Sequence, residues 1–224
     1  EQDPPDHGEW RKRYTDALTP DALASLEPRV EAIADQLIDR FAGRGTADLV
    51  SEFTEPLPVM GICAAIGLEG KKTEEIRALA LASTSTVADP EAQRSANRQL
   101  GAFILQELFE RRIAPRDDYL TRIAQMEADG RPLGDYDLTM FMIGFLVAGH
   151  ETTTSALSGL LGHVLPSSDL KSRLLADDAA MACAIEEAVR LTSPFHGFSR
   201  TATRDVDMKG VTIPEGEVVR LCWA

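Results

Sequence analysis

Cysteine, aromatic side chains and positive charge are all scarce in this sequence. Its 224 residues include 3 cysteines and 6% aromatic residues, and the formal net charge is −13. Cys63, Cys183 and Cys222 stand singly among apolar neighbours, a pattern typical of reduced thiols in a cytoplasmic protein rather than of a disulfide framework. The negative charge argues against a nucleic-acid partner, which needs a basic surface, and against an anionic membrane surface.

A signal peptide, a membrane-spanning run and an internal repeat are also missing from the pattern. The apolar run at residues 140–149 is far shorter than the ~18 residues that a transmembrane helix requires. The hydrophobic share of 44% supports a packed core, and the length suits one large domain or two small ones. We therefore expect a protein with neither a membrane nor a nucleic-acid partner.

Apolar residues recur at spacings of three and four along most of the chain, and this periodicity predicts a mainly α-helical fold. The expected helices cover residues 6–18, 19–41, 55–67, 71–87, 91–112, 119–128, 137–165 and 179–191. The basic doublets at 71–72 and 111–112 are expected to be solvated helix ends.

After Pro194 the periodicity changes to that of strands. They are expected at residues 198–204, 211–216 and 218–222, with hairpin turns at 207–210 and 214–216. Residues 48–53 are expected to form only a short connection.

One stretch combines an apolar, core-type helix with polar residues whose burial costs free energy. An apolar run from Met140 leads into Ala148-Gly149-His150-Glu151 and three threonines, residues 152–154. A buried Glu151 is costly unless it is paired or protonated, and three consecutive threonines favour a bulge in the helix. Gly149 would let a flat ligand approach the backbone. A satisfied polar patch in a core helix is the alternative interpretation.

A zinc site is not expected in this stretch. His150-Glu151 begins like the zinc-protease motif His-Glu-x-x-His, but position 154 is threonine. Because the second histidine is missing one turn later, the helix has no two-ligand face, and no metal ligand is assigned in the chain.

Residues 148–154 resemble the central-helix signature of the cytochrome P450 family. In that family the helix crosses over a haem, and the acid and the first threonine handle protons. The resemblance therefore implies that Glu151 and Thr152 are catalytic, that Ala148, Gly149 and Thr152 lie against haem, and that Val147 lines the substrate pocket.

The start of the sequence is similar to a second motif of bacterial P450s. Asp3-Pro4-Pro5-Asp6-His7 is followed one turn later by Arg11. The resemblance implies that His7 and Arg11 bind a haem propionate. From the spacing alone, a solvated basic helix face is the alternative.

Two more motifs follow the central helix in the family's order. The resemblance makes Glu187 and Arg190, spaced as Glu-x-x-Arg, a structural network, and it assigns Arg200 to a haem propionate. It also places Phe195, His196 and Gly197 in the substrate pocket, although His196 alone could be a surface histidine. The helices expected at 71–87 and 91–112 would form a lid over the substrate.

The sequence departs from the family at its ends. The motif Phe-x-x-Gly-x-x-x-Cys-x-Gly, whose cysteine thiolate ligates the haem iron, does not occur. We therefore expect an internal fragment that lacks the N-terminal part and the C-terminal ligand loop. Residues 1–224 would form one partial P450 domain, a helical core with small β-sheet elements near the C-terminus.

The resemblance implies a haem-dependent monooxygenase that hydroxylates a small organic substrate. It would receive electrons from a ferredoxin-type partner that docks near Lys12 and Arg13. The alternative is a haem-free helical binding or interaction protein, or an inactive fragment, because the cysteine ligand is absent.

Overall fold

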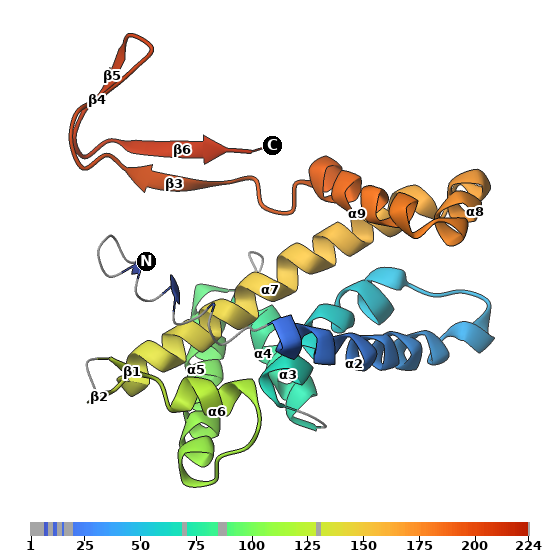
Figure 1. Cartoon of the computed structure of the whole chain (residues 1–224), viewed down its shortest axis with the longest axis horizontal. Helices are drawn as coiled ribbons and strands as arrows, with labels where there is room; N and C mark the ends of the chain where they lie inside the picture. The colour runs from blue at the N-terminus through green and yellow to red at the C-terminus, as the bar shows by residue number, and fades with distance from the viewer. Residues whose placement is uncertain are drawn as a thin grey trace. The chain divides into compact units, whose positions relative to one another are not determined.

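The computed structural model describes residues 7, 8, 11, 12, 15, 20–68, 71–84, 89–128 and 131–223. The chain divides into two compact units, a first unit of Glu1–Thr154 and a second unit of Ser155–Ala224. Figure 1 traces the elements of both units along the chain. The expectation of one domain over residues 1–224 stays a prediction.

Helices make up most of the first unit, as the periodicity predicts. They are α2 (Pro20–Asp39), α3 (Pro56–Ile66), α4 (Lys71–Thr84), α5 (Pro90–Ile113), α6 (Tyr119–Ala124) and α7 (Asp135–Val164). The last of these, α7, continues into the second unit. Neighbouring helices pack pairwise: α2 against α3, α4 against α5, and α5 against α6.

Two predictions for the first unit are wrong in detail. The helix expected over residues 119–128 ends at Ala124, and a two-stranded hairpin of β1 (Glu127–Ala128) and β2 (Arg131–Pro132) follows. The connection expected before α3 is instead a π-helical turn, Val50–Thr54. Short segments like these carry too few residues for periodicity to separate helix, strand and turn.

Local chemistry sets the ends of α3. Pro56 occupies the first turn, where a missing N–H costs nothing. At the other end Gly67 takes a left-handed conformation with φ of 89°, and its N–H donates to the carbonyls of the last turn. A Cβ at Gly67 would lie 2.5 Å from Asp118, so packing as well as backbone conformation requires glycine there.

The core of the first unit is a continuous cluster of buried apolar side chains from α3 to α7. Its fully buried members include Cys63, Ile66, Ile76, Leu100, Ile104, Leu120, Ile123, Leu138 and Met142. The buried side chains of α7 in this unit, Leu138, Met142, Leu146 and His150, are spaced by four residues and form one stripe.

The expectation of solvated charges at residues 111–112 is wrong. Arg111 is 0% exposed and donates to Asp118 (2.7 Å), to Glu107 (3.2 Å) and to the carbonyl of Gly67 (2.9 Å). The guanidinium thus ties the end of α5 to the start of α6 and the end of α3. Arg112 is half-buried and donates to the carbonyl of Ala124 at 3.1 Å.

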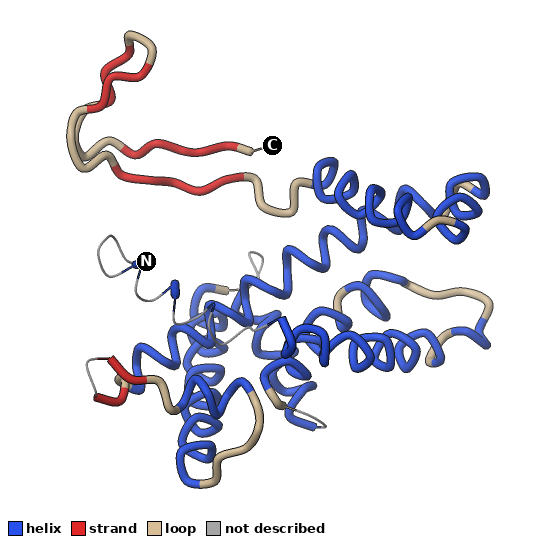
Figure 2. Tube along the Cα trace, in the orientation of Figure 1, coloured by secondary structure: helices blue, strands red, loops and turns tan. Residues whose placement is uncertain are grey.

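The second unit holds the end of α7, two further helices and four strands. The elements are α8 (Ser168–Ala176), α9 (Asp178–Thr192), β3 (Gly197–Thr201), β4 (Val206–Met208), β5 (Val211–Ile213) and β6 (Val218–Cys222). Antiparallel pairing joins β3 to β6, with Ser199 opposite Arg220, and β4 to β5 (Figure 2).

The strand expected over residues 198–204 is wrong at its C-terminal end. It ends at Thr201, and the chain then forms β4 where the sequence predicts the start of a turn. The turn itself is confined to Lys209 and Gly210, both with positive φ. The buried apolar side chains described in this unit are Leu174 and Ala188. Across the described part of the chain, no helix is long and apolar enough to cross a membrane.

Candidate functional site

The polar turn of α7 is an uninterrupted part of the α-helix, so the predicted bulge is wrong. The Thr152 hydroxyl donates to the Ala148 carbonyl at 2.8 Å, one turn earlier. This competition was the reason to expect a bulge, but the helix accommodates the extra hydrogen bond without breaking. The π-helical distortion lies elsewhere, at Val50–Thr54.

The side chains of this turn separate onto two faces. Ala148 and Glu151 are exposed and Thr152 is half-buried, and their spacing of three and four places them on one face. His150 lies on the buried stripe instead. The arrangement leaves a small residue, a carboxyl and a hydroxyl together on an open helix face, with Val147 half-buried beside it.

Gly149 is in contact with a neighbouring helix of the first unit. A Cβ at this position would lie 2.8 Å from Cδ1 of Ile62 on α3, so a larger residue would require the Ile62 side chain to shift. The small size of Gly149 thus makes room for Ile62 of α3. Contact between Gly149 and a cofactor stays a prediction.

His150 is the residue of this turn that the sequence interpretation undervalued. Its side chain is 3% exposed, and neither ring nitrogen has a hydrogen-bond partner among the described residues. Burial lowers the pKa of His150, while the carboxylate and backbone of Glu55 and the carboxylate of Glu151 act in the opposite direction. The spacing of four from Leu146 was the available signal in the sequence.

His7 and Arg11 lie in helical conformation and are exposed. Thr15 is also in helical conformation and donates from its hydroxyl to the carbonyl of Arg11 at 2.9 Å. Lys12 is exposed as well, whereas Arg13 lies outside the described residues. Propionate binding by His7 and Arg11 stays a prediction.

Glu187 and Arg190 pair on α9 as their spacing predicts. Arg190 donates to both carboxylate oxygens, at 2.8 Å and 2.6 Å. These hydrogen bonds lower the pKa of Glu187 and raise that of Arg190. Both side chains are more than half exposed, at 53% and 67%. Within the described residues the network therefore consists of one solvated pair.

The loop before β3 collects aromatic side chains. Phe195 stacks on Phe198 with ring centroids 4.2 Å apart, and Trp223 meets Phe198 edge-on at 6.1 Å. The Arg200 guanidinium lies 5.6 Å from the Phe198 ring centroid and donates to the carbonyl of Ser199. All four side chains are exposed.

Gly197 and His196 are both explained by strand pairing. A Cβ on Gly197 would lie 2.1 Å from the carbonyl oxygen of Leu221 on β6, so only glycine fits. The carbonyl of exposed His196 accepts from the Trp223 N–H at 3.2 Å and extends the same ladder. Their assignment to a substrate pocket, with Phe195, stays a prediction.

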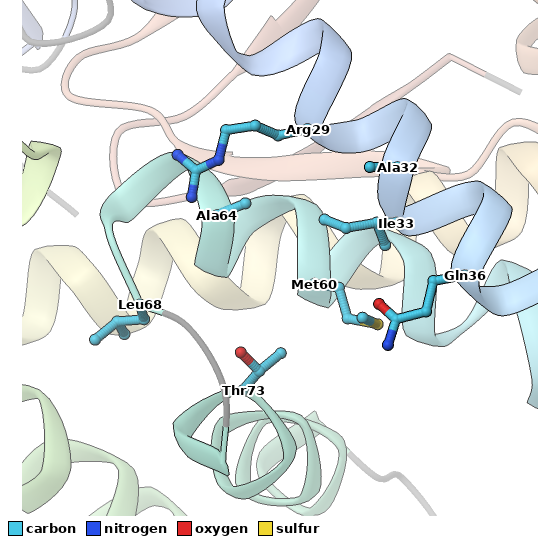
Figure 3. Close-up of a pocket in the computed structure, with 8 residues that line it drawn as sticks. All are labelled: Arg29, Ala32, Ile33, Gln36, Met60, Ala64, Leu68 and Thr73. Carbon is cyan, nitrogen blue, oxygen red and sulfur yellow. The ribbon is translucent and has the colours of Figure 1, made fainter.

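A groove of about 290 Å³ lies elsewhere in the first unit, between α2, α3 and α4. Figure 3 draws the residues that line it: Arg29, Ala32, Ile33, Gln36, Met60, Ala64, Leu68 and Thr73. Among its lining residues Ala64 and Leu68 are apolar and buried, whereas Arg29 and Gln36 are exposed. The sequence interpretation did not anticipate it, because none of these residues forms a motif.

Comparisons with known proteins cover nearly all of this chain. It is 35% identical over 221 residues to Cytochrome P450 107B1 from Saccharopolyspora erythraea, covering 97% of this chain and 54% of that protein. It is 33% identical over 222 residues to the mycinamicin IV hydroxylase/epoxidase of Micromonospora griseorubida, covering 97% and 56% respectively. The ligand-free structure of cytochrome P450 TbtJ1 is similar with a TM-score of 0.87 at 34% identity, covering 97% of this chain and 59% of that one.

No family model matches the chain. The helical fold with its small C-terminal sheets is nevertheless that of the haem-thiolate monooxygenases. Together with the sequence identities, this confirms the resemblance: the chain belongs to the cytochrome P450 family. It spans about half the length of the curated relatives it matches.

Haem is the cofactor of this family, and the residues of the chain fit it only in part. The open face of α7 offers small Ala148 and a hydroxyl, and Arg200, His7 and Arg11 are exposed cations or hydrogen-bond donors suited to propionates. An axial thiolate is not provided. Burial raises the pKa of Cys63 to about 12 despite a hydrogen bond with Thr73, and the other two cysteines are exposed and isolated.

Proposed function

We propose that the protein to which this chain belongs is a haem-dependent monooxygenase that hydroxylates a small organic substrate. Family membership supports the reaction class, and one relative is named a hydroxylase/epoxidase. These names do not favour the alternative of a haem-free binding protein. When bound, haem supplies the oxidising centre, so the residues described here have to position groups and move protons.

The observation that carries this proposal is the hydrogen bond from Thr152 to the Ala148 carbonyl on the open face of α7. With its proton committed to Ala148, the Thr152 oxygen has lone pairs free to accept a hydrogen bond from water. If the hydroxyl rotates away from the carbonyl, it can instead donate its proton to a molecule on the open face of the helix. A positioned hydroxyl can therefore pass one proton inward and regain one.

Glu151 is suited to resupply that proton. Its side chain is exposed, so its carboxyl can exchange protons with bulk solvent, and it lies on the same helix face as Ala148. We assign Glu151 as the solvent-side carrier and Thr152 as the inner carrier. Val147 and the Phe195–Gly197 segment would line the substrate pocket, and Glu187 with Arg190 would stay structural.

Three further assignments belong to this proposal. His7, Arg11 and Arg200 would bind haem propionates, which their charge or hydrogen-bonding capacity and their exposure support. A ferredoxin-type electron donor would dock near exposed Lys12 and near Arg13. A cytoplasmic location is supported by the three unpaired cysteines.

The test replaces Thr152 by alanine in the haem-loaded protein. Without the positioned hydroxyl, oxygen reduction should continue while organic product per electron pair falls by about tenfold or more, because positioned proton transfer contributes about 10²–10⁴-fold. Oxygen uptake, peroxide and product are measured together. Thr153→Ala is the matched control, since Thr153 is exposed on the next position of the same helix.

Equal product yield in Thr152→Ala and in the unmodified protein would contradict the assignment. An equal loss in both threonine variants would also contradict it, because the effect would then follow from the helix and not from the hydroxyl at residue 152.

A further inference from the structure

The groove between α2, α3 and α4 has polar groups at its ends and apolar groups in its middle. Its lining residues on α2 follow the spacing i, i+3, i+4 and i+7 of a single helix face: Arg29, Ala32, Ile33 and Gln36. Arg29 and Gln36 are therefore about 10 Å apart along the helix axis, with Ile33 between them (Figure 3). This face of α2 suits an elongated ligand that is charged at one end.

The apolar side of the groove comes from α3. Met60 and Ala64 lie on this helix and Leu68 directly follows its end, at spacings of four residues. Ala64 and Leu68 are buried, and the small side chain at position 64 leaves room that a larger one would fill. Thr73 on α4 is 9% exposed and lines the groove from a third helix. A space of about 290 Å³ with these walls suits a slender apolar chain.

The charges of α2 are divided between two sides of the helix. Arg29 is the only basic residue in its sequence. The acidic residues are exposed and spaced by four, and they form a line along another side: Glu27, Glu31, Asp35 and Asp39. Arg29 is two positions from both Glu27 and Glu31, which places it on nearly the opposite side. In a chain with a net charge of −13, the groove thus carries the one cation of α2.

We propose that this groove binds an amphipathic carboxylate, whose anionic head pairs with Arg29 and whose single apolar chain lies along Ile33 and Met60 toward Gln36. A guanidinium has five N–H donors, so Arg29 can hold a carboxylate and keep a further partner. The apolar chain gains free energy by leaving water for the side chains of α2 and α3. This inference goes beyond the proposed function, because it assigns a second ligand that haem chemistry does not require.

The groove lies on the side of α3 away from α7. The side chain of Ile62 lies against Gly149 of α7. Ile62 is two residues from both Met60 and Ala64, so it points to nearly the opposite side of α3. Binding in the groove can therefore be measured whether or not the Thr152 hydroxyl has its proposed role.

Methyl NMR of the haem-loaded protein, titrated with octanoate, observes the groove directly. Four of the lining residues carry informative methyl groups, and chemical-shift changes should centre on them: Ile33, Met60, Ala64 and Leu68. Binding at about millimolar concentration is expected of so small a ligand. Hexanoate should bind about fourfold or more weakly, because it removes two fewer CH₂ groups from water. Octylammonium, with the opposite head charge, should bind about fivefold or more weakly.

Two variants test the two parts of the groove. Arg29→Gln should weaken octanoate binding by about fivefold, the upper range for a solvent-exposed ion pair, and should remove most of its salt dependence. Arg40→Gln is the matched control, since Arg40 is exposed directly after the end of α2 and does not line the groove. Ala32→Leu should fill the groove and abolish the shifts, whereas Ala24→Leu, at another exposed alanine of α2, should not.

Recognition of the anionic head is overturned if Arg29→Gln and Arg40→Gln weaken binding equally, or if octylammonium binds as tightly as octanoate. Groove methyl groups that do not shift with octanoate overturn the proposal as a whole. In that case the occupant is another part of the protein or a second copy. Nuclear Overhauser contacts from Met60 to another segment would identify the first, and loss of a dimer in Ala32→Leu would identify the second.

Discussion

Two arginine–carboxylate pairs on helices show how differently the two units are built. Glu107 and Arg111 on α5 are 2% and 0% exposed, and Asp118 and the Gly67 carbonyl complete the hydrogen bonds of the guanidinium. Glu187 and Arg190 on α9 have shorter hydrogen bonds but are mostly exposed. In the first unit the Arg111 guanidinium also links α5 to the start of α6 and the end of α3, whereas in the second the pair joins only two residues of one helix.

The apolar side chains follow the same division. The first unit buries a continuous cluster from α3 to α7, while Leu174 and Ala188 are the buried apolar residues described in the second. Large apolar side chains such as Leu191, Val218 and Trp223 are exposed there. The polar turn of α7 thus adjoins a packed apolar cluster in the first unit, whereas few apolar side chains are buried among the described residues of the second.

The largest effect should come from breaking the buried ion pair. Arg111→Met would leave Glu107 and Asp118 buried without their cation and should lower the free energy of unfolding by about 3–5 kcal/mol. Urea unfolding of the chain measures this. Arg190→Met is the matched control and should leave the unfolding midpoint unchanged, because Glu187 is solvated. Equal losses in the two variants would remove the contrast between the units.

A cavity in the first unit should cost slightly less. Leu120 is fully buried on α6, and Leu120→Ala should lower the free energy of unfolding by about 2–5 kcal/mol. Leu191→Ala, at an exposed site on α9, should change it little. In hydrogen exchange, the loss of stability in Leu120→Ala should be shared by all helices of the first unit.

In the second unit, the side chain that caps a helix should contribute more stability than a hydroxyl within the same helix. Ser167 accepts from the Leu170 N–H at 3.2 Å at the start of α8, and Ser167→Ala should cost about 0.5–2 kcal/mol of local stability. Ser172→Ala removes a hydroxyl that only bonds the carbonyl one turn earlier and should be neutral. Amide exchange in α8 reports both changes.

The smallest effect is a difference in acid sensitivity. Burial would raise the pKa of Asp118, but hydrogen bonds from Thr121 and Arg111 outweigh it and hold the pKa below its ordinary value of 3.8. The stability from this ionised group is therefore present above pH 3.8 and lost as the pH falls through the lower folded-state pKa. Asp118→Asn should flatten the acid limb of the unfolding curve, and Glu187→Gln should not. A steeper limb in Asp118→Asn would contradict the account.

Long, strongly periodic segments could be predicted from the sequence. The central helix is expected at residues 137–165 and is observed at Asp135–Val164, because apolar periodicity over 30 residues leaves little ambiguity. The Glu187–Arg190 pair was predictable for the same reason, since both partners lie on one helix face. The family motifs also identified the fold, which the comparisons confirm.

Features that depend on distant partners could not be predicted in this way. Burial of Arg111 depends on the Gly67 carbonyl, 44 residues earlier in the chain, which no local spacing encodes. The bulge expected at the threonines fails because a single hydroxyl bond to Ala148 satisfies the helix. His150 was visible as the fourth member of a stripe, but no local spacing showed that both of its ring nitrogens would be buried.

Native-state hydrogen exchange of the whole 224-residue chain, measured amide by amide, tests most directly whether a packed first unit anchors the functional turn of α7. The account predicts that amides on the buried stripe, from Leu138 to His150, exchange as slowly as those of the core helices α5 and α6. Amides of α9 and β6 should exchange far faster, through local opening. Equal protection in both units, or rapid exchange between Leu138 and His150, would contradict it.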